Sequence, residues 1–294
     1  MTLGIYPHRY AHMVNKFSVE TFPFHSDLAA VRRGLDEFEN TVFQRRSYVG
    51  LSALVINSRG EIQGGVSGRI GWGWLHIDML WVTEGLRYNG HGSRLLSTIE
   101  AAACARGIHH AYLTTTSFQA FPFYQQHGYE ACGVLEDRPP GHTYYYLAKR
   151  ELSATVQHYP VEVDAPMSYL QALHHGLNDY NARHGTPIEA RRLSVFMRDG
   201  TDKIRGGLIG STYWGWFDLY TMWIQADLRR RGYGAHMLNL AEQQAIKRGC
   251  PCIVTEAIGD RMRRFFDRQG YEIFGTLADR PPGHPTYFVR KILV

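Results

Sequence analysis

The sequence contains little cysteine and no long hydrophobic run. Its four cysteines form no CxxC pair and share no spacing between the two halves of the chain: Cys104, Cys132, Cys250 and Cys252. This pattern argues against a disulfide framework and a zinc site, and it fits a reducing cytoplasm. No apolar run approaches the ~18 residues that cross a membrane, and the opening MTLGIYPHRY lacks the apolar stretch of a secretory signal. We therefore expect a cytoplasmic protein with no metal and no membrane partner.

The excess of positive charge is small as well. The formal net charge is +5, and the positive residues are scattered, apart from the run Arg229–Arg231. A nucleic-acid-binding surface would combine Lys and Arg with aromatic residues on one face. We therefore expect no nucleic-acid partner, and a preference for an anionic small ligand explains the charge equally well.

What the chain does contain is one long repeat. The string DRPPGH occurs at Asp137–His142 and again, 142 residues later, at Asp279–His284. The same shift relates Trp72 to Trp214, and roughly 30 of the 86 positions ending at Lys149 are identical in the two copies. A period of this length is the size of a whole domain. The 294-residue chain is therefore predicted to hold two homologous domains, at residues 9–150 and 155–294, with a linker at 151–155.

Each copy alternates predicted strands and helices. In the first copy the pattern predicts helices over 27–39, from the glycine loop to about 106, and over 119–127, and strands over 13–17, 51–56, 62–70, 74–82, 111–115, 129–135 and 143–148. Alternation along the strand 74–82 predicts one face with Leu75, Ile77, Met79 and Trp81, and another with His76, Asp78, Leu80 and Val82. The predicted fold class is α/β, with a mixed sheet flanked by helices, used twice.

The first chemical signal is an Arg-x-x-Gly-x-Gly loop between a strand and an amphipathic helix. It begins at Arg87 in the first copy and at Arg229 in the second. Glycine lets the backbone turn tightly, and the helix start offers free N–H groups at the positive end of its dipole. Such a junction binds phosphate or pyrophosphate, to which an arginine adds charge-assisted hydrogen bonds. A helix start that needs glycine only for packing is the simpler alternative, and the identical spacing in two copies favours the phosphate site.

This strand, loop and helix resemble the acetyl-CoA pyrophosphate loop of the GNAT N-acetyltransferase family. The later segment Ser117–Glu130, the PPGH turn and Lys149 look like a branch that acts on small molecules. The resemblance covers nearly the whole chain and implies two tandem acyl-CoA N-acyltransferase (GNAT) domains, each with a mixed, splayed central sheet. It implies acetyl-CoA as the co-substrate, held by these residues: Trp81, Val82, Arg87, Tyr88, Asn89, Gly90, His91, Gly92, Ser93, Arg229, Arg230, Arg231, Gly232, Tyr233, Gly234 and Ala235.

The resemblance also implies a base that takes a proton from the acceptor amine. The matching position is His76 in the first copy and Asp218 in the second. In members similar to serotonin N-acetyltransferase, histidines occupy the positions of His76 and Asp78, so Asp78 is a candidate as well. An imidazole titrates near neutral pH, which makes His76 a credible base, directly or through water. A histidine that only hydrogen-bonds within the sheet is the alternative.

A proton donor for the leaving thiolate is the other implied role. The matching tyrosine is Tyr124 in the first copy, whereas the second copy has Phe266. Phenylalanine has no proton to give. We therefore expect the first domain to be catalytic. The second domain is either a structural or CoA-binding pseudo-domain, or it catalyses without the tyrosine. For Tyr124 itself, a purely packing role is the alternative.

The predicted function is transfer of acetyl from acetyl-CoA directly to a primary amine of a small-molecule acceptor. The alternative is a CoA-binding sensor or pseudoenzyme without turnover. The sequence does not identify the acceptor or the oligomeric state.

Overall fold

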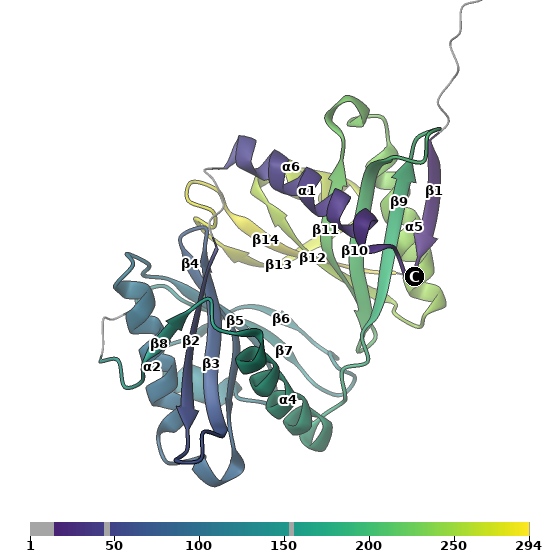
Figure 1. Cartoon of the computed structure of the whole chain (residues 1–294). Helices are drawn as coiled ribbons and strands as arrows, with labels where there is room; N and C mark the ends of the chain where they lie inside the picture. Colours follow the sequence, from purple (N-terminus) through teal and green to yellow (C-terminus); the bar gives the residue numbers. More distant parts are fainter. Residues whose placement is uncertain (1–14, 44–47, 153–155, 294) are drawn as a thin grey trace, which may run out of the picture.

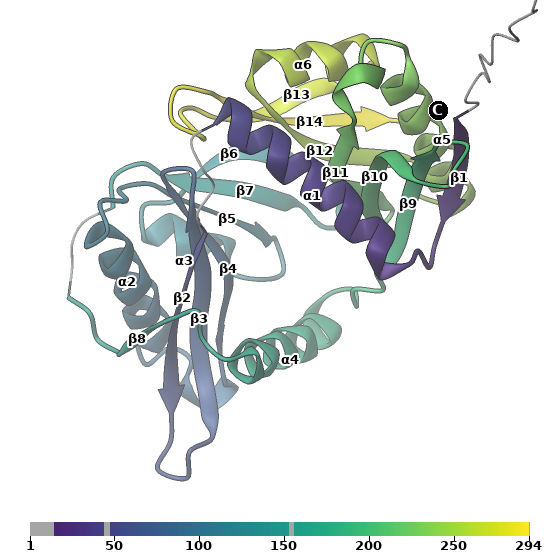
Figure 2. The same cartoon turned by 45° about the horizontal axis from the view of Figure 1, so that its top comes forward.

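The structure is a computed structural model that describes residues 15–43, 48–152 and 156–293. Its strands form one mixed sheet of 14 strands, arranged as two bodies that each carry helices (Figures 1 and 2). We call these bodies the first unit and the second unit, after the copy that supplies most of their strands. The predicted α/β class, with a mixed sheet flanked by helices in each copy, is confirmed.

The first unit is built on residues 49–149. Its strands lie in the order β2-β3-β4-β5-β7-β6; β4 and β5 are parallel neighbours, and the other neighbours are antiparallel. Helix α2 buries Leu95, Leu96 and Ile99 against the sheet because these residues share one helix face. The elements are β2 (Val49–Ile56), β3 (Ile62–Gly71), β4 (Trp74–Val82), η1 (Glu84–Leu86), α2 (His91–Cys104), β5 (Ala111–Thr116), α3 (Phe121–Gln126), β6 (Glu130–Leu135) and β7 (Tyr144–Lys149).

The second unit repeats this plan in the order β9-β10-β11-β12-β14-β13. Its core again lies between the sheet and the long helix that follows the glycine loop, where α5 buries Met237, Leu238 and Ala241. The elements are β9 (Arg191–Arg198), β10 (Ile204–Tyr213), β11 (Trp216–Ile224), η2 (Ala226–Leu228), α5 (Tyr233–Lys247), β12 (Cys252–Ile258), α6 (Gly259–Arg268), β13 (Glu272–Leu277) and β14 (Thr286–Ile292).

The two copies exchange their first strand and helix. Strand β1 (Lys16–Glu20) pairs with β9, and α1 (His25–Val42) packs on β10 and β11 of the second unit. Strand β8 (Val161–Val163) pairs with β2, and α4 (Met167–His184) packs on β3 and β4 of the first unit. In Figure 1 the purple α1 therefore lies on green strands, and the teal α4 lies on blue ones.

Matching glycines allow both exchanged helices to approach the sheet closely. A Cβ atom at Gly34 on α1 would overlap the ring of Trp223, and one at Gly176 on α4 would overlap the ring of Trp81. The predicted boundaries, 9–150 and 155–294, thus follow the repeat in the sequence, whereas each packed unit takes its β8–α4 or β1–α1 segment from the other copy.

A hydrogen-bonded carboxylate ties each long helix to its own sheet. Glu100 on α2 accepts hydrogen bonds from the Tyr129 hydroxyl and from Lys149 Nζ, both at 2.8 Å. Glu242 on α5 accepts from Tyr271 at 2.9 Å and from Lys291 at 2.8 Å. These three positions are identical in the two copies because they hold together the same helix and strands.

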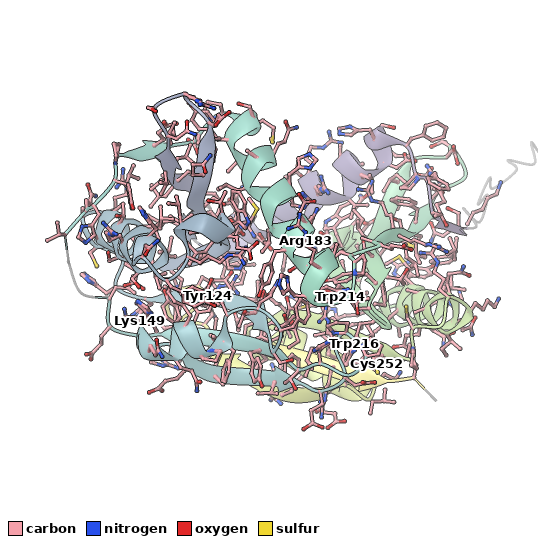
Figure 3. All side chains as sticks on the ribbon, turned by 90° about the horizontal axis from the view of Figure 1, so that it is seen from below. Tyr124, Lys149, Arg183, Trp214, Trp216 and Cys252 are labelled. Carbon is pink, nitrogen blue, oxygen red and sulfur yellow. The ribbon has the colours of Figure 1, made fainter. Side chains whose placement is uncertain are left out.

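The two units join where β6 and β13 pair at Gly133 and Gly275. A side chain at Gly275 would meet the backbone of the opposite strand, so the close approach needs glycine there. Apolar side chains from both copies bury one another beside this junction, among them Trp74, Leu277 and Phe288. The end of α4 near Arg183 lies beside Trp214 of the second unit (Figure 3), and Trp214 Nε1 donates to the carbonyl of Thr186 at 3.0 Å.

Two local expectations differ from the structure. The predicted strand 13–17 begins later, at Lys16, because its register is set by pairing with β9 of the other copy; residues 13 and 14 lie outside the described residues. The predicted alternation along β4 is wrong after Ile77 because the register shifts there, which leaves Asp78 outside the pairing with β3. Leu80 and Val82 consequently pack against the same core as Leu75 and Ile77.

Candidate active site

The site of the first unit begins where β4 and β5 separate. Their pairing covers only Leu75–Ile77 with Ala111–Leu113, after which β5 continues with β7 alone. The register shift at Asp78 turns the end of β4 away from β5. Beyond Ile77 the two parallel strands therefore diverge, and the side of β4 that faces β5 is available for an extended ligand. In the second unit, β11 and β12 likewise pair only from Trp216 to Leu219 on β11.

The first glycine loop leads from β4 into α2. Tyr88 and Gly90 have positive φ angles of 62° and 77°, and the helix starts at His91 with Gly90 as its N-cap. The second loop has the same form, with φ of 62° at Arg230 and 83° at Gly232. A left-handed N-cap of this kind favours glycine and turns the first helical N–H groups toward the loop.

Space in front of both loops fits a phosphate group. The nearest atoms to a Cβ built at Gly90 belong to the flexible Arg94 side chain, at 3.6 Å, and nothing lies within 4 Å of one built at Gly232. Gly92 packs against Phe123, whose ring a Cβ would meet at 3.5 Å. The loop residue Tyr88 is fully exposed. The residues at both loops thus fit the pyrophosphate of acetyl-CoA, which would meet backbone N–H groups and the positive end of a helix.

The arginine of each loop hydrogen-bonds the backbone at the end of the preceding strand. Arg87 Nε donates to the Val82 carbonyl at 3.1 Å, and its guanidinium lies 4.8 Å from the ring centre of Tyr180 on α4. Arg229 Nε donates to the Ile224 carbonyl at 2.8 Å, and its guanidinium lies over Phe38 on α1. Each arginine therefore shapes its loop and contacts the helix exchanged from the other copy, which the sequence did not indicate.

The remaining residues predicted to bind acetyl-CoA lie near these arginines. Asn89 offers its carbonyl to Arg94 Nη2 at 2.6 Å, and His91 Nδ1 lies 2.7 Å from the Tyr159 hydroxyl. Trp81 lies against α4 at Gly176. The others hold the positions predicted for them at the ends of the loops or on the first turns of the helices: Ser93, Arg231, Tyr233, Gly234 and Ala235.

His76 and Asp78 lie next to each other on β4. His76 Nδ1 is 3.1 Å from Asp78 Oδ1 and 3.1 Å from Arg69 Nη2, and Arg69 also lies 3.2 Å from Asp78. The imidazole stacks on Tyr112 with ring centres 4.3 Å apart. When Nδ1–H donates to Asp78, the other ring nitrogen carries the lone pair that can accept a proton.

Tyr124 lies on α3, in the core of the first unit (Figure 3). Its side chain is 7% exposed, and its ring contacts those of Phe123 and Tyr129. Burial raises the pKa of the Tyr124 hydroxyl above its ordinary value, so the group stays protonated at neutral pH. Phe266 on α6 is 1% exposed and contacts Phe265 and Tyr271 in the same way. The two units therefore share the packing and differ in the hydroxyl.

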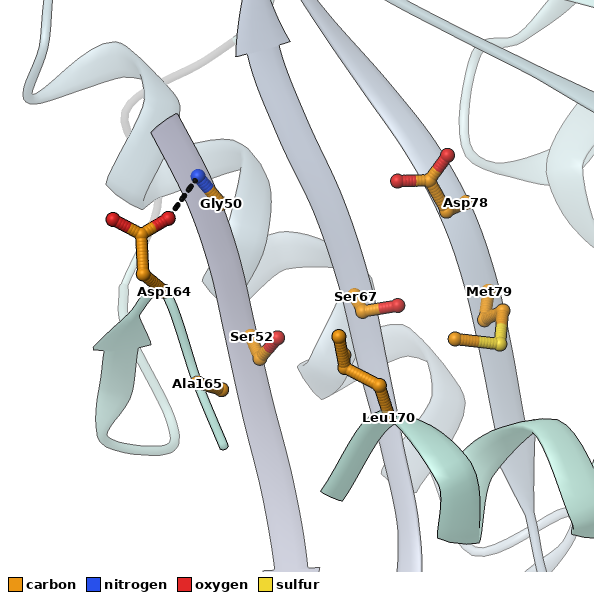
Figure 4. A pocket seen from close by; sticks show the side chains of 8 residues that line it. All are labelled: Gly50, Ser52, Ser67, Asp78, Met79, Asp164, Ala165 and Leu170. Atoms are coloured by element: carbon orange, nitrogen blue, oxygen red, sulfur yellow. Dashed lines mark hydrogen bonds between the residues drawn. The ribbon is translucent and has the colours of Figure 1, made fainter. Parts of the chain in front are cut away.

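A cavity of about 370 Å³ opens beside the bulge of β4. Strands β2, β3 and β4 form its floor, and the segment from β8 to α4 borders it (Figure 4). Its lining residues are Gly50, Ser52, Ser67, Asp78, Met79, Asp164, Ala165 and Leu170. Asp78 thus contacts both His76 and the cavity, and the second copy supplies part of the cavity of the first unit.

In the second unit, Asp218 stands at the position that matches His76 and has different partners. Asp218 accepts hydrogen bonds from Arg138 Nη2, which lies 2.6 Å from both of its oxygens, and from the Tyr213 hydroxyl at 2.6 Å. Arg138 comes from the DRPPGH turn of the first copy and is fully buried. Burial alone would lower the pKa of Arg138, but Asp218 outweighs it and raises the pKa above its ordinary value. Asp218 is therefore held in a buried ion pair.

Arg280, the matching arginine of the second copy, does not bind the residue at the proposed base position. Arg280 donates to the Tyr112 hydroxyl of the first copy and pairs with Glu256 at 2.8 Å. Its guanidinium lies over Tyr112, on which His76 stacks. The imidazole of His76 thus rests on a tyrosine held by the other copy, whereas Asp218 is itself bound by the arginine.

Sequence reasoning missed Arg138, Arg280 and Asp164. The repeated DRPPGH string marked both arginines, but nothing in it showed that each reaches the other unit. Asp164 lies before the part of the second copy that matches the first without a gap, so no motif pointed to it. Within residues 15–43, 48–152 and 156–293, no group of three or more His, Cys, Asp and Glu side chains is arranged to hold a metal ion, and no helix is long and apolar enough to cross a membrane.

The chain is similar to known acetyltransferases. A model of the acetyltransferase (GNAT) family matches residues 14–129 and again residues 142–271. Blasticidin-S acetyltransferase of Streptomyces morookaense is 39% identical over 109 residues, which are 37% of this chain and 80% of that protein. An acetyltransferase of Agrobacterium fabrum is 29% identical over 121 residues, 41% of this chain and 88% of that protein. The solved structure of an acetyltransferase from Bacillus cereus shares 35% identity and a TM-score of 0.42, covering 44% of this chain and 94% of that one.

Proposed function

Because the chain belongs to the acetyltransferase (GNAT) family, we propose that its first unit transfers the acetyl group of acetyl-CoA directly to a primary amine of a small molecule. The observation that carries this proposal is the divergence of β4 and β5 after Ile77. It lies on the strand that connects Asp78, at a cavity that suits a small acceptor, with the glycine loop, which suits a pyrophosphate.

In this proposal the cofactor-binding residues lie on β4 and the loop after it. Acetyl-CoA, when bound, supplies the activated acetyl thioester. The backbone N–H groups from Gly90 to Ser93 bind its phosphates, and Arg87 holds the loop in shape through the Val82 carbonyl. The free side of β4 lines the path from the loop to Asp78, with the backbone of Trp81 and Val82 at its loop end.

His76 is the proposed base, directly or through an ordered water. In the proposed tautomer Nδ1–H donates to Asp78, 3.1 Å away, and the other nitrogen is free to take a proton from the amine. Arg69 Nη2, also 3.1 Å from Nδ1, then donates to Asp78 and not to the ring. Asp78 then stabilises the imidazolium that forms. Stacking on Tyr112 restrains the ring orientation.

Tyr124 is the proposed acid. Its raised pKa keeps the hydroxyl protonated, which is the form needed to give a proton to the leaving thiolate. The second unit lacks this hydroxyl, and its Asp218 is bound by Arg138. For the second unit we therefore infer CoA binding without turnover, supported by the preserved loop at Gly232.

Thiol release from acetyl-CoA, followed over a panel of primary amines, tests the proposal. Blasticidin S is the first acceptor in the panel, because a relative with 39% identity is named for it. We expect thiol release that requires an amine, together with an equal amount of acetylated amine by mass spectrometry. Calorimetric binding of acetyl-CoA without turnover of any amine would favour the sensor alternative, and no binding would remove the proposal.

A further inference from the structure

The cavity beside Asp78 is built for a particular chemistry. Its volume of about 370 Å³ lies in the range of small-molecule sites, which hold roughly 300–1,000 Å³. Strands of the first copy and the segment from Asp164 to Leu170 of the second copy border it (Figure 4). A molecule in this cavity therefore touches both copies of the repeat.

One wall presents a hydroxyl that has no partner. Ser67 on β3 is 4% exposed, and its Oγ is buried without a hydrogen-bond partner among the residues that the structure describes. A buried polar atom without a partner costs stability. Because Ser67 lines the cavity, a polar group of a bound molecule can supply the missing hydrogen bond.

Two carboxylates border the cavity from opposite sides (Figure 4). Asp78 interacts with His76 and Arg69, at 3.1 Å and 3.2 Å. Asp164 accepts a hydrogen bond from the backbone N–H of Gly50 at 3.0 Å. A backbone amide is a neutral donor, so this bond orients the Asp164 carboxylate without cancelling its charge. The Asp164 side of the cavity therefore attracts a cation.

The second unit lacks this chemistry. The 142-residue shift also relates the exchanged segments to each other. Strand β8 pairs with β2 in the same register in which β1 pairs with β9. The counterparts replace both acids and the serine: Tyr220 for Asp78, Phe22 for Asp164 and Ile209 for Ser67. The polar cavity thus belongs to the unit that also keeps His76 and Tyr124.

We propose that this cavity binds the acceptor and selects small molecules that carry a second cationic group, which faces Asp164 while the reacting amine lies beside Asp78. Ser67 Oγ hydrogen-bonds a polar atom of the same molecule. This substrate class rests on the proposed acetyl transfer for its reaction, but the cation site stands on the cavity itself. The second copy, through Asp164, therefore sets the specificity of the first unit.

The test compares two probes that differ in one terminal group, which is a charged ammonium in diaminobutane and a neutral hydroxyl in aminobutanol. The full chain, saturated with CoA, is titrated with each probe by calorimetry, and acetylation of each is measured separately with acetyl-CoA. We expect diaminobutane to bind roughly two- to five-fold more tightly, because Asp164 is exposed to solvent and an exposed ion pair is weak. Asp164→Asn should remove most of that difference.

Asp202→Asn is the matched control. Asp164 and Asp202 have positive φ angles of 48° and 64°, a conformation that asparagine tolerates, and both substitutions remove one negative charge. Asp202 lies in the second unit and does not line the cavity, so its variant should bind both probes as the unmodified chain does. Ser67→Ala should weaken both probes about equally while leaving the melting temperature unchanged or raised.

The outcomes separate the two proposals. Binding of diaminobutane that depends on Asp164, without acetylation of any amine, would keep the cation site and overturn the proposed function. Acetylation with no preference for diaminobutane, or a preference that Asp164→Asn leaves intact, would overturn the cation site. If Asp164→Asn and Asp202→Asn weaken diaminobutane binding equally, the preference comes from the net charge of the chain, and the cation site is overturned as well.

Discussion

Tyr124 and Phe266 fill the same place in the two units and differ by one hydroxyl. We expect Tyr124→Phe to lower kcat by about 10²–10⁴-fold, the usual contribution of one acid or base group. Acetyl-CoA affinity should be nearly unchanged, because the ring packing against Phe123 and Tyr129 survives. Steady-state thiol release and calorimetric titration measure the two effects.

The control is Tyr129→Phe, at a tyrosine whose ring contacts that of Tyr124. Its hydroxyl donates to Glu100 at 2.8 Å, away from the strand divergence. Losing it should lower stability while leaving kcat unchanged. A change of less than threefold for Tyr124→Phe would show that Tyr124 only packs.

Arg138 and Asp218 form a buried pair across the two copies. Replacing Arg138 by Met leaves a carboxylate without its counterion, so we expect a loss of about 3–5 kcal/mol in the free energy of unfolding. The double variant with Asp218→Leu should recover at least half of that loss, because two apolar side chains replace the pair. Urea denaturation of the single and double variants measures this coupling, and additive losses would contradict it.

Buried tyrosines give the chain a defined response to alkaline pH. Burial raises the pKa of the Tyr112 and Tyr124 hydroxyls above the ordinary 10.0. Below pH 10 these groups are neutral in both the folded and unfolded states, so stability does not depend on them. Above pH 10 the unfolded chain ionises first, and stability falls by about 1.4 kcal/mol per pH unit for each such tyrosine. Thermal unfolding from pH 8 to pH 12 should show this loss; a constant melting temperature would contradict it.

Residue-level prediction worked where neighbours in the sequence are also neighbours in space. His76 and Asp78 are two residues apart on one strand, and the structure places them 3.1 Å apart. Their proposed roles, and those of the loop residues toward acetyl-CoA, stay predictions. The contacts of Arg138 and Asp164 depend on segments from the other copy, and no pattern along the chain reports which copy a turn will meet.

At the scale of elements, the two glycine loops have one form and different surroundings. Gly90 and Gly232 both cap a helix with φ near 80°. We expect Gly90→Trp to abolish turnover, because an indole there blocks the first loop and strains its backbone. Gly232→Trp should spare most of the turnover, since the second unit is proposed only to bind CoA.

Gly107→Trp serves as the control. Gly107 has a similar φ of 77° and open space around it, and it follows α2 instead of preceding it. The variant should have the backbone strain without the blocked loop. Activity lost only with Gly232→Trp would reverse the roles of the two units.

Most elements were predictable, since periodicity reports which faces are buried. The strand 74–82 and the helix after the glycine loop appear as β4 and α2. The bulge at Asp78 was not predictable, because a register shift depends on the opposing strand β3. It changes which residues of β4 share a face, and it does so where the proposed chemistry takes place.

At the scale of the whole molecule, the repeat and the family resemblance were readable from the sequence, and the family model now matches both copies. The exchange of β1–α1 with β8–α4 was not readable. Two homologous sheets offer the same docking face, so hydrophobic pattern alone does not choose between packing within a copy and packing across copies.

The exchange predicts how half of the chain behaves. A fragment of residues 1–150 lacks β8 and α4. It also lacks β9, β10 and β11, on which its own β1 and α1 pack in the full chain. We expect it to form a dimer that trades β1–α1 between two copies, or to remain unfolded. Sedimentation velocity, with the full chain as reference, measures its mass. Adding a fragment of residues 151–294 should restore a one-to-one complex that binds acetyl-CoA. Failure of the two fragments to form this complex would contradict the exchange.

The exchanged strand also bears on how the protein is made. Lys16 pairs with Arg198, so a ribosome releases β1 and α1 long before their partner strands exist. Strands β2 to β4 also leave the ribosome before α4, so the face of the sheet that α4 covers in the folded protein stays exposed until α4 has been synthesised. The nascent chain therefore carries two exposed apolar surfaces through much of its synthesis, and neither half can finish folding before the other has begun. Translation speed and chaperones that shield apolar surface thus act on both halves together.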